Sequence, residues 1–239
     1  MKKIILFIFL IFVQNAYGKW LLIDDQKITK HFVDIESIKT NGNIRKVWTH
    51  QEYSEPQKGI KSSVLQIELD CDKQLVHPLF AKSYRESNLE GNSVESDVSN
   101  KSSWIKISKN DDKEFYSYYM FSCFYKPIKS YWSLFSSSNL SELYIDKNTL
   151  IRDGNRATIQ GYSNILDKKV GLDGVGSLQS LYIFECKDET FKFTNSFSFP
   201  QKNLQGNLID YFISPPEHTI KLSEDNFYYN LMKFACNSK

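Results

Sequence analysis

The sequence lacks an excess of charge of either sign. Its 239 residues include 30 Lys and Arg against 28 Asp and Glu, and the basic residues stand singly or in pairs. Proteins that bind nucleic acid usually carry a basic excess or a basic stripe, so no nucleic-acid partner is expected. Beyond its first residues the sequence also lacks any apolar run near the roughly 20 residues that cross a bilayer, so no membrane span is predicted.

Alanine is scarce, whereas aromatic residues are abundant. The chain holds 17 Phe, 14 Tyr and 4 Trp, together 35 of 239 residues. With the many Val and Ile residues, this composition favours β-structure. Hydrophobic residues make up 41% and charged residues 24%, which is typical of a folded soluble protein and excludes a collagen, a coiled coil or a low-complexity chain.

The first 18 residues have the pattern of a secretory signal peptide. Two lysines precede an apolar run at 4–13, and the small residues Ala16 and Gly18 precede a cut site before Lys19. We therefore predict an exported protein, either periplasmic or secreted to the cell surface. Removal of this leader leaves 28 basic and 28 acidic residues, because the leader carries two lysines and no acid.

After the leader, the sequence repeats itself once. Similar segments occur in the same order at an offset of 112 to 115 residues: 32–43 with 144–155, 88–92 with 203–207, 104–108 with 219–223, and 115–123 with 228–236. A constant offset indicates one structural unit present twice. The predicted organisation is a signal peptide at 1–18, a first domain at 19–123, a linker at 124–142 and a second domain at 143–239.

The same repeat predicts how the four cysteines form disulfides. Cys71 corresponds to Cys186 and Cys123 to Cys236, so we predict the disulfides Cys71–Cys123 and Cys186–Cys236. A unit of roughly 100 residues buries only a modest core, and closing a loop of about 50 residues contributes about 4 kcal/mol. A zinc site built from all four cysteines and reactive thiols are the alternatives. They fit less well, because no two cysteines have the short spacing of a zinc ribbon or a redox pair.

Each copy is predicted to fold as several strands followed by a closing helix, an α+β arrangement. Asn41-Gly42 and Asp153-Gly154 are typical of hairpin turns. Even spacing predicts that Phe191, Phe193, Phe197 and Phe199 lie on one face of a strand. The expected strands are 44–53, 64–70, 156–162 and 178–184, and the expected helices are 111–122 and 225–235.

Residues that could carry catalysis are sparse. No two histidines have the i, i+4 spacing of a metalloprotease helix, and no Gly-x-Ser-x-Gly motif is present, so we predict no enzyme, cofactor or metal. Glu68, Asp70 and Asp72 alternate, which indicates a solvated strand face or a site private to the first copy. The histidines are predicted on the surface or in loops: His31, His50, His77 and His218.

An aromatic cluster lies in the segment predicted as a linker. Two interpretations are open: the cluster packs between the copies, which we favour, or it forms an exposed contact patch. Trp48 and Trp104, in contrast, lie in strand-like segments and are predicted in the core. The candidate interface residues are Tyr125, Tyr131, Trp132 and Phe135.

The first copy carries a further ordered set of residues: Trp20, Phe32, Asp34, Ser37, Ile38, Gly42, Trp48, Asp70, Cys71, Tyr84, Gly91, Trp104 and Cys123. In that order the first copy resembles the surface-adhesin protein E family of Gram-negative bacteria. The second copy is similar to a degenerate version, in which Glu185 replaces the Asp, and Gln160 and Thr219 replace two Trp residues.

The resemblance implies an antiparallel sheet with a C-terminal helix tethered to it by a disulfide, and no catalytic activity. It also implies a protein partner, namely host matrix or plasma proteins such as vitronectin, laminin or plasminogen, and self-association into a homo-oligomer. The chain differs from the name-giving adhesin in its tandem arrangement and in having no lipid-anchoring cysteine after the leader. A periplasmic structural or accessory protein, or an inhibitor of a bacterial envelope complex, is the alternative function.

Overall fold

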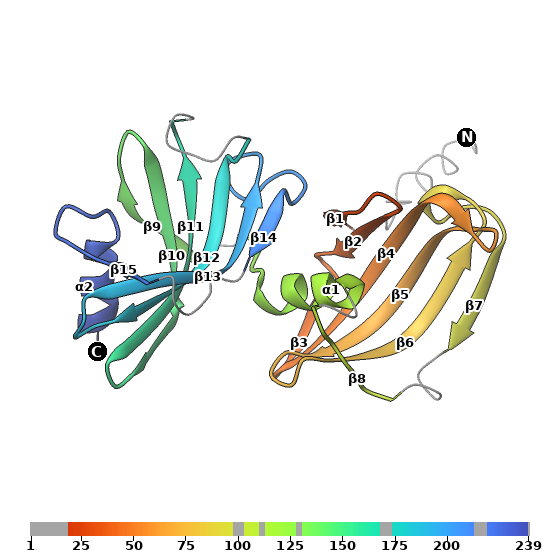
Figure 1. Ribbon diagram of the computed structural model, residues 1–239, viewed down its shortest axis with the longest axis horizontal. Helices are drawn as coiled ribbons and strands as arrows, with labels where there is room; N and C mark the ends of the chain where they lie inside the picture. Colours follow the sequence, from red (N-terminus) through yellow and green to blue (C-terminus); the bar gives the residue numbers. More distant parts are fainter. Residues whose placement is uncertain are drawn as a thin grey trace, which may run out of the picture.

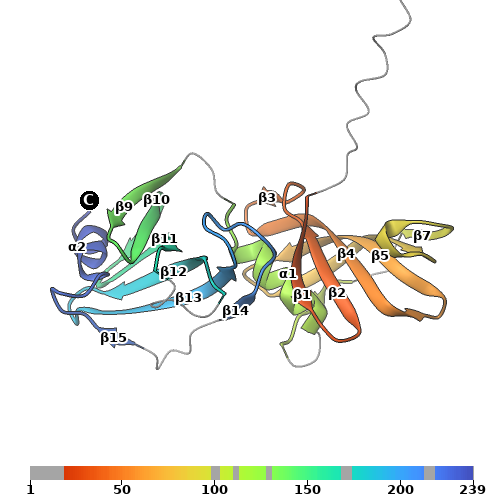
Figure 2. The ribbon, with the colours of Figure 1, turned by 90° about the horizontal axis from the view of Figure 1, so that it is seen from above.

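A computed structural model describes residues 19–97, 103–109, 113–127, 131–167, 174–212 and 219–238. It contains two antiparallel sheets, each followed by a helix, and the two sheets lie on either side of the first helix (Figures 1 and 2). This confirms the predicted α+β fold of two similar units. The predicted signal peptide, residues 1–18, and His218 lie outside the described residues.

The first sheet, sheet 1, has the strand order β1-β2-β4-β5-β6-β7, with β3 paired to β4 and β8 paired to β6. Its strands are β1 (Trp20–Asp25), β2 (Thr29–Asp34), β3 (Lys39–Asn41), β4 (Ile44–Gln57), β5 (Ile60–Asp70), β6 (Leu75–Tyr84), β7 (Ser93–Asp97) and β8 (Ile105–Lys106), and a short 3-10 helix, η1 (Ser87–Leu89), follows β6. The hairpin predicted at Asn41-Gly42 joins β3 to β4, where Gly42 has a φ of +56°.

The second sheet, sheet 2, has the order β14-β13-β12-β11-β10-β9, with β15 paired to β13. Its strands are β9 (Trp132–Ser137), β10 (Ser141–Asp153), β11 (Arg156–Ile165), β12 (Ser177–Glu185), β13 (Thr190–Phe199), β14 (Asp210–Phe212) and β15 (Ile220–Lys221). Strand β9 lies inside the segment 124–142 that was expected to be a linker. Sheet 2 therefore extends back to Trp132, because this apolar segment pairs with β10 instead of connecting the units freely.

The two helices are α1 (Lys113–Phe124) and α2 (Tyr229–Asn237), close to the predicted ranges. Each carries the second cysteine of a disulfide whose first cysteine directly follows a sheet strand. The bonds Cys71–Cys123 and Cys186–Cys236 confirm the predicted pairing, with sequence separations of 52 and 50 residues. Each helix is thereby tethered to its own sheet.

The four phenylalanines of β13 do not share one face, which corrects the prediction from their even spacing. Opposite Ser180 the strand contains an extra residue, a β-bulge at Asn195, whose φ is +49°. Because a bulge shifts the alternation of side chains by one position, Phe191 packs in the core under α2 whereas Phe197 packs on the opposite face.

This change of face divides the interior into two cores. The second core lies between α2 and the face of sheet 2 that carries Leu143, Ile159 and Phe184. The first core contains α1 and one face of sheet 1, but it also includes Phe197 of sheet 2. Helix α1 is therefore packed on two sides, by sheet 1 and by the face of sheet 2 that points away from α2 (Figure 1).

Candidate protein-binding site

Two equivalent sheet faces are turned away from the helices of their own units. We call the face of sheet 2 that is covered by α1 the docked face; its contact residues are Trp132, Tyr144, Gln160, Tyr162, Gln179, Phe197 and Phe199. The corresponding face of sheet 1 is the open face; its aromatic residues are Trp20, Phe32, Trp48, Phe80 and Tyr84, together with His50.

Aromatic contacts hold the docked face to α1 and to the residue that follows it. The ring of Phe121 lies edge-on to Phe197, with 5.8 Å between the ring centroids. Tyr125 lies 6.1 Å from Phe197 and 5.8 Å from Phe199. Burial raises the pKa of Tyr125 to about 12, since its ionised form would lose contact with water.

Hydrogen bonds between glutamine side chains and the backbone fix the same junction. The N–H of Lys126 donates to Oε1 of Gln179 over 2.7 Å, and Nε2 of Gln179 donates to the carbonyl oxygen of Lys126 over 2.6 Å. Nε2 of Gln160 donates to the carbonyl oxygen of Phe124 over 3.3 Å. Hydrogen bonds are directional, so these three bonds help to set how the two units sit against each other.

The structure separates the four candidate interface residues. Tyr125 is buried at the junction, and Trp132 packs beside it, with Nε1 donating to the carbonyl oxygen of Pro127 over 3.1 Å. The Tyr131 hydroxyl donates to the same carbonyl oxygen over 2.9 Å. Phe135 instead turns toward α2, with its ring centroid 5.5 Å from that of Phe234, because it lies three positions after Trp132 and side chains alternate along β9.

Three aromatic residues form a cluster at the edge of the docked face, and only Trp132 of the three was among the predicted interface residues. Tyr144 stacks on Tyr162, with a centroid distance of 4.7 Å and an interplanar angle of 3°, and Trp132 meets Tyr162 edge-on at 5.2 Å. Burial raises the pKa of Tyr162 to about 12. All three side chains belong to the first core or pack against it.

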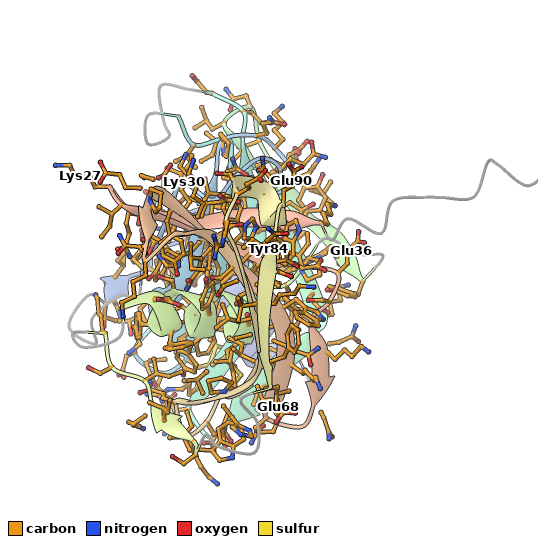
Figure 3. The ribbon with its side chains drawn as sticks, turned by 90° about the vertical axis from the view of Figure 1, so that its right-hand side faces the viewer. Lys27, Lys30, Glu36, Glu68, Tyr84 and Glu90 are labelled. Carbon is orange, nitrogen blue, oxygen red and sulfur yellow. A yellow bond between two sulfur atoms is a disulfide. The ribbon has the colours of Figure 1, made fainter. Side chains whose placement is uncertain are left out.

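The open face carries the same cluster at equivalent positions. Phe32 stacks on His50 at 5.1 Å, and Trp20 meets His50 edge-on at 5.4 Å. The repeat gave a signal for these residues, because Trp20, Phe32 and His50 precede Trp132, Tyr144 and Tyr162 by 112 residues each. Figure 3 views the molecule from the end formed by sheet 1 and labels Lys30, Glu68 and Tyr84, which come from β2, β5 and β6.

Two histidines lie in the interior, which corrects their prediction as surface or loop residues. His31 is 2% exposed and its Nδ1 lies 3.2 Å from the hydroxyl of Tyr118; burial lowers its pKa, and the charge of Asp24 opposes that shift. Burial also lowers the pKa of His50, against the opposing effect of Glu52, whose Oε1 lies 2.7 Å from Nε2. Strand position, not polarity, decides this placement.

The alternating acids of the first copy have structural contacts. Oδ1 of Asp70 accepts the backbone N–H groups of Asp72 and Lys73 and so caps the turn after β5. Oε2 of Glu68 lies 3.8 Å from Nδ1 of His77. Among the described residues, no group of three His, Cys, Asp or Glu side chains could hold a metal ion.

Trp48 and Trp104 were predicted in the core, but neither belongs to one of the two cores. Trp48 is half-buried on the open face, 5.7 Å from the ring of Phe80. Trp104 is 41% exposed and lies against His77 at 5.2 Å. The residues that take the core positions beside Trp48 are Val47 and Thr49, because side chains alternate along β4.

Comparison with known proteins agrees with this arrangement of two copies. The family model of surface-adhesin protein E matches residues 20–121 and again residues 132–237. The chain belongs to the surface-adhesin protein E family. Adhesins are surface-exposed or secreted proteins, and within the described ranges no helix of this family member is long and apolar enough to cross a membrane.

Among solved structures, this adhesin-family chain matches the selenomethionine form of protein E from Haemophilus influenzae. The sequence identity is 17%, the match covers 46% of this chain and 89% of that chain, and the TM-score is 0.32. No curated protein matches the chain.

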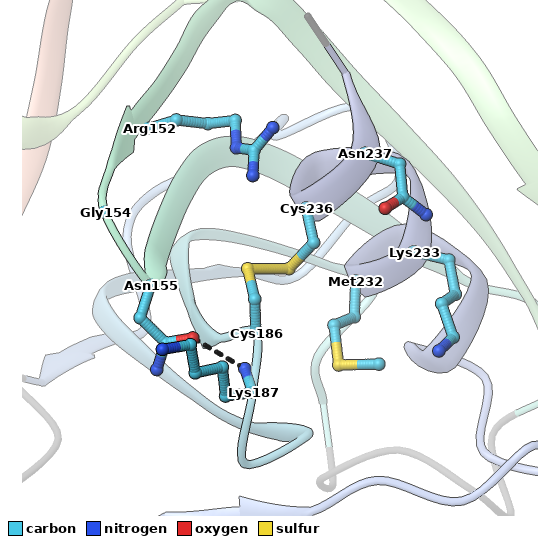
Figure 4. Close-up of a pocket in the computed structure, with 9 residues that line it drawn as sticks. All are labelled: Arg152, Gly154, Asn155, Cys186, Lys187, Met232, Lys233, Cys236 and Asn237. Carbon is cyan, nitrogen blue, oxygen red and sulfur yellow. Dashed lines mark hydrogen bonds between the residues drawn. A yellow bond between two sulfur atoms is a disulfide. The ribbon is translucent and has the colours of Figure 1, made fainter.

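A separate pocket of about 490 Å³ lies beside the second disulfide of this protein E family member (Figure 4). Its basic residues already have partners in part: Nη1 of Arg152 donates to the carbonyl oxygen of Ser238 over 3.0 Å, and Nζ of Lys233 lies 3.1 Å from Oε1 of Glu189. The pocket offers positive charge near Lys187 but no nucleophile or acid–base pair, so it does not support a catalytic assignment.

Proposed function

We propose that this chain is an exported, non-catalytic protein-binding module that acts as an adhesin at the bacterial surface. The observation that carries the proposal is the match of both halves of the chain to the family model of surface-adhesin protein E. The two disulfides support export, because such bonds persist in oxidising compartments outside the cytosol.

The partner class proposed is host matrix or plasma protein, with vitronectin, laminin and plasminogen as the probes to try first. Protein interfaces are enriched in aromatic residues, and the open face presents Trp48 and Tyr84 only half-buried. Catalysis is not part of the proposal, since the acids and buried histidines described above have structural contacts.

Surface location is tested by protease treatment of intact source cells, with a periplasmic protein as the control. Release of peptides from this chain while the control stays intact is the expected result. Equal protection of both proteins would refute the adhesin and would favour a periplasmic accessory protein.

Binding is tested with the purified disulfide-bonded chain on immobilised vitronectin, laminin and plasminogen. Saturable binding to at least one of them is expected, with serum albumin as the negative surface. Binding that equals the albumin signal on all three would refute the proposed partner class.

A further inference from the structure

We propose that the open face of sheet 1 binds an amphipathic helix of the protein partner, in the way that the docked face of sheet 2 binds α1 within the same chain. This inference rests on the proposed function and deepens it, because it names the binding face and the class of partner segment. The internal junction supplies the template for both.

The strand registers show that the two faces are equivalent. Trp20 is paired with Asp34 in β1 and β2, and Trp132 is paired with Asp146 in β9 and β10. Toward the other edge of each sheet, β5 pairs with β6 and β12 pairs with β13, and each of these pairs contains a bulge. In this register Val64, Lys82 and Tyr84 precede Gln179, Phe197 and Phe199 by 115 residues.

A loop at the end of each face has the same hydrogen bonds. In sheet 2 the Leu204 N–H donates to Oγ of Ser177, and the Leu204 side chain is 6% exposed in the first core. In sheet 1 the Leu89 N–H donates to Oγ of Ser62, but Leu89 is only half-buried. The open face thus has the same strand register and the same loop as the docked face. Within the described part of the chain, no helix packs on the open face as α1 packs on the docked face.

The composition of the open face is that of a contact surface. The solvated face of an antiparallel sheet is normally polar, whereas this face carries Trp20, Phe32, Trp48, Phe80 and Tyr84. None of these five residues is among the described residues that form the two cores. On the docked face, Phe197 and Phe199 are fully buried against Phe121 and Tyr125, whereas Tyr84, the equivalent of Phe199, is only half-buried. The central residue is buried on both faces, since His50 is 6% and Tyr162 is 3% exposed.

The helix that occupies the docked face defines the chemistry of the occupant. Ser117, Phe121 and Tyr125 are spaced by four residues and form one stripe along α1 and its end. Phe121 meets Phe197, whose position on the open face is taken by Lys82, which lies with its Nζ 5.5 Å from the ring centroid of Tyr84. A partner helix that combines an acidic residue at the position of Phe121 with an aromatic residue at the position of Tyr125 therefore complements the open face.

The helix α2 of a second copy is a poorer match for the open face. At the positions of Met120, Phe124 and Tyr125 in α1, α2 and its end carry Lys233, Asn237 and Ser238. Phe234, at the position of Phe121, already packs on Phe135, and its ring centroid lies 5.8 Å from Nζ of Lys147. A head-to-tail chain of copies would lose most of the aromatic contacts that hold the internal junction.

The test uses the full disulfide-bonded chain and a labelled peptide with the sequence of residues 113–127 and the changes Phe121→Glu and Cys123→Ser. Binding is followed by fluorescence anisotropy, and a second peptide that also carries Tyr125→Ser is the ligand control. We expect saturable binding of the first peptide and binding weaker by roughly tenfold or more for the second.

Open-face variants locate the binding site. Tyr84→Ser and Trp48→Ser are each expected to weaken peptide binding by roughly tenfold or more, whereas Phe212→Ser, an aromatic residue 36% exposed on β14, leaves binding unchanged. Circular dichroism and the melting temperature establish that each variant is folded. No peptide binding, or equal binding by all variants, overturns the proposal.

Two further measurements distinguish the possible failures. If a host protein binds the chain and Tyr84→Ser leaves that binding unchanged, the open-face inference is overturned and the proposed function stands. If the peptide binds as expected but no host protein does, the host-partner proposal is overturned and the open face remains a helix-binding site. Concentration-dependent dimers in sedimentation that Tyr84→Ser abolishes would assign the face to a second copy and refute the partner helix.

Discussion

Replacement of Phe197 by alanine should uncouple the two units of the chain. Phe197 is fully buried, yet it lies in a strand of sheet 2 and packs against Phe121 and Tyr125 of the first unit. Truncation of a buried Phe to Ala costs about 3–5 kcal/mol, and each aromatic pair adds about 0.5–1.5 kcal/mol beyond buried area. Most of this loss should fall on the junction between α1 and the docked face.

The matched control is Phe191→Ala, which removes an equally large buried side chain from the other face of the same strand. In calorimetry we expect one cooperative transition for the native chain and two separate transitions for Phe197→Ala. Phe191→Ala should lower the stability of sheet 2 without separating the transitions, because the contact with α1 stays intact.

A double-mutant cycle measures the contact itself. Phe121→Ala and Phe197→Ala should couple by about 0.5–1.5 kcal/mol, whereas Phe121→Ala and Phe191→Ala should add within about 0.5 kcal/mol. Additive effects for Phe121 and Phe197 would refute the reasoning, because two rings in contact cannot lose the same interaction twice.

Three other changes have defined outcomes. Replacement of Cys186 and Cys236 by serine opens a loop of 50 residues and should cost about 4 kcal/mol in urea unfolding; an unchanged midpoint would contradict the entropic account. Gly176→Ala would place a Cβ 2.6 Å from the carbonyl oxygen of Pro200, so we expect the free energy of unfolding to fall by about 1–3 kcal/mol and the melting temperature to drop. An unchanged melting temperature would show that this close approach is absent. Burial lowers the pKa of His31 below 6.5, so as the pH falls the imidazole is protonated in the unfolded chain before it is protonated in the folded chain. The free energy of unfolding should therefore decrease as the pH drops below about 6.5. His31→Gln should reduce this pH dependence in urea titrations between about pH 7.5 and pH 5. A steeper slope in the variant would contradict the assignment.

Repeats and cysteines made much of the architecture predictable. The offset of 112 to 115 residues gave two units and both disulfides, because equivalent cysteines in a repeated fold occupy equivalent places. The hairpin glycines and the strands after them were also predicted, since Gly42 and Gly154 adopt the positive φ that such turns require. These features depend on neighbours in the sequence or on the repeat itself.

Side-chain placement was less predictable from local pattern. Even spacing put Phe191 and Phe197 on one face, but the bulge at Asn195 separates them, and a bulge depends on the pairing of two strands. His31 and His50 were expected on the surface, but His31 packs against Tyr118 of α1, and the rings of Trp20 and Phe32 pack against His50. Neither effect is visible in a window of one strand.

The sequence by itself determined the two copies, their disulfides and the strand-and-helix order, because periodicity, turn residues and cysteine spacing act over short distances or through the repeat. Only the tertiary structure decided that α1 packs against both sheets, since Phe121 and Phe197 are in contact although they lie 76 residues apart in the sequence. It also decided that equivalent faces differ in exposure. One face of sheet 2 is covered because a helix precedes it in the chain, whereas the described part of the chain contains no helix that precedes sheet 1, and its equivalent face stays open.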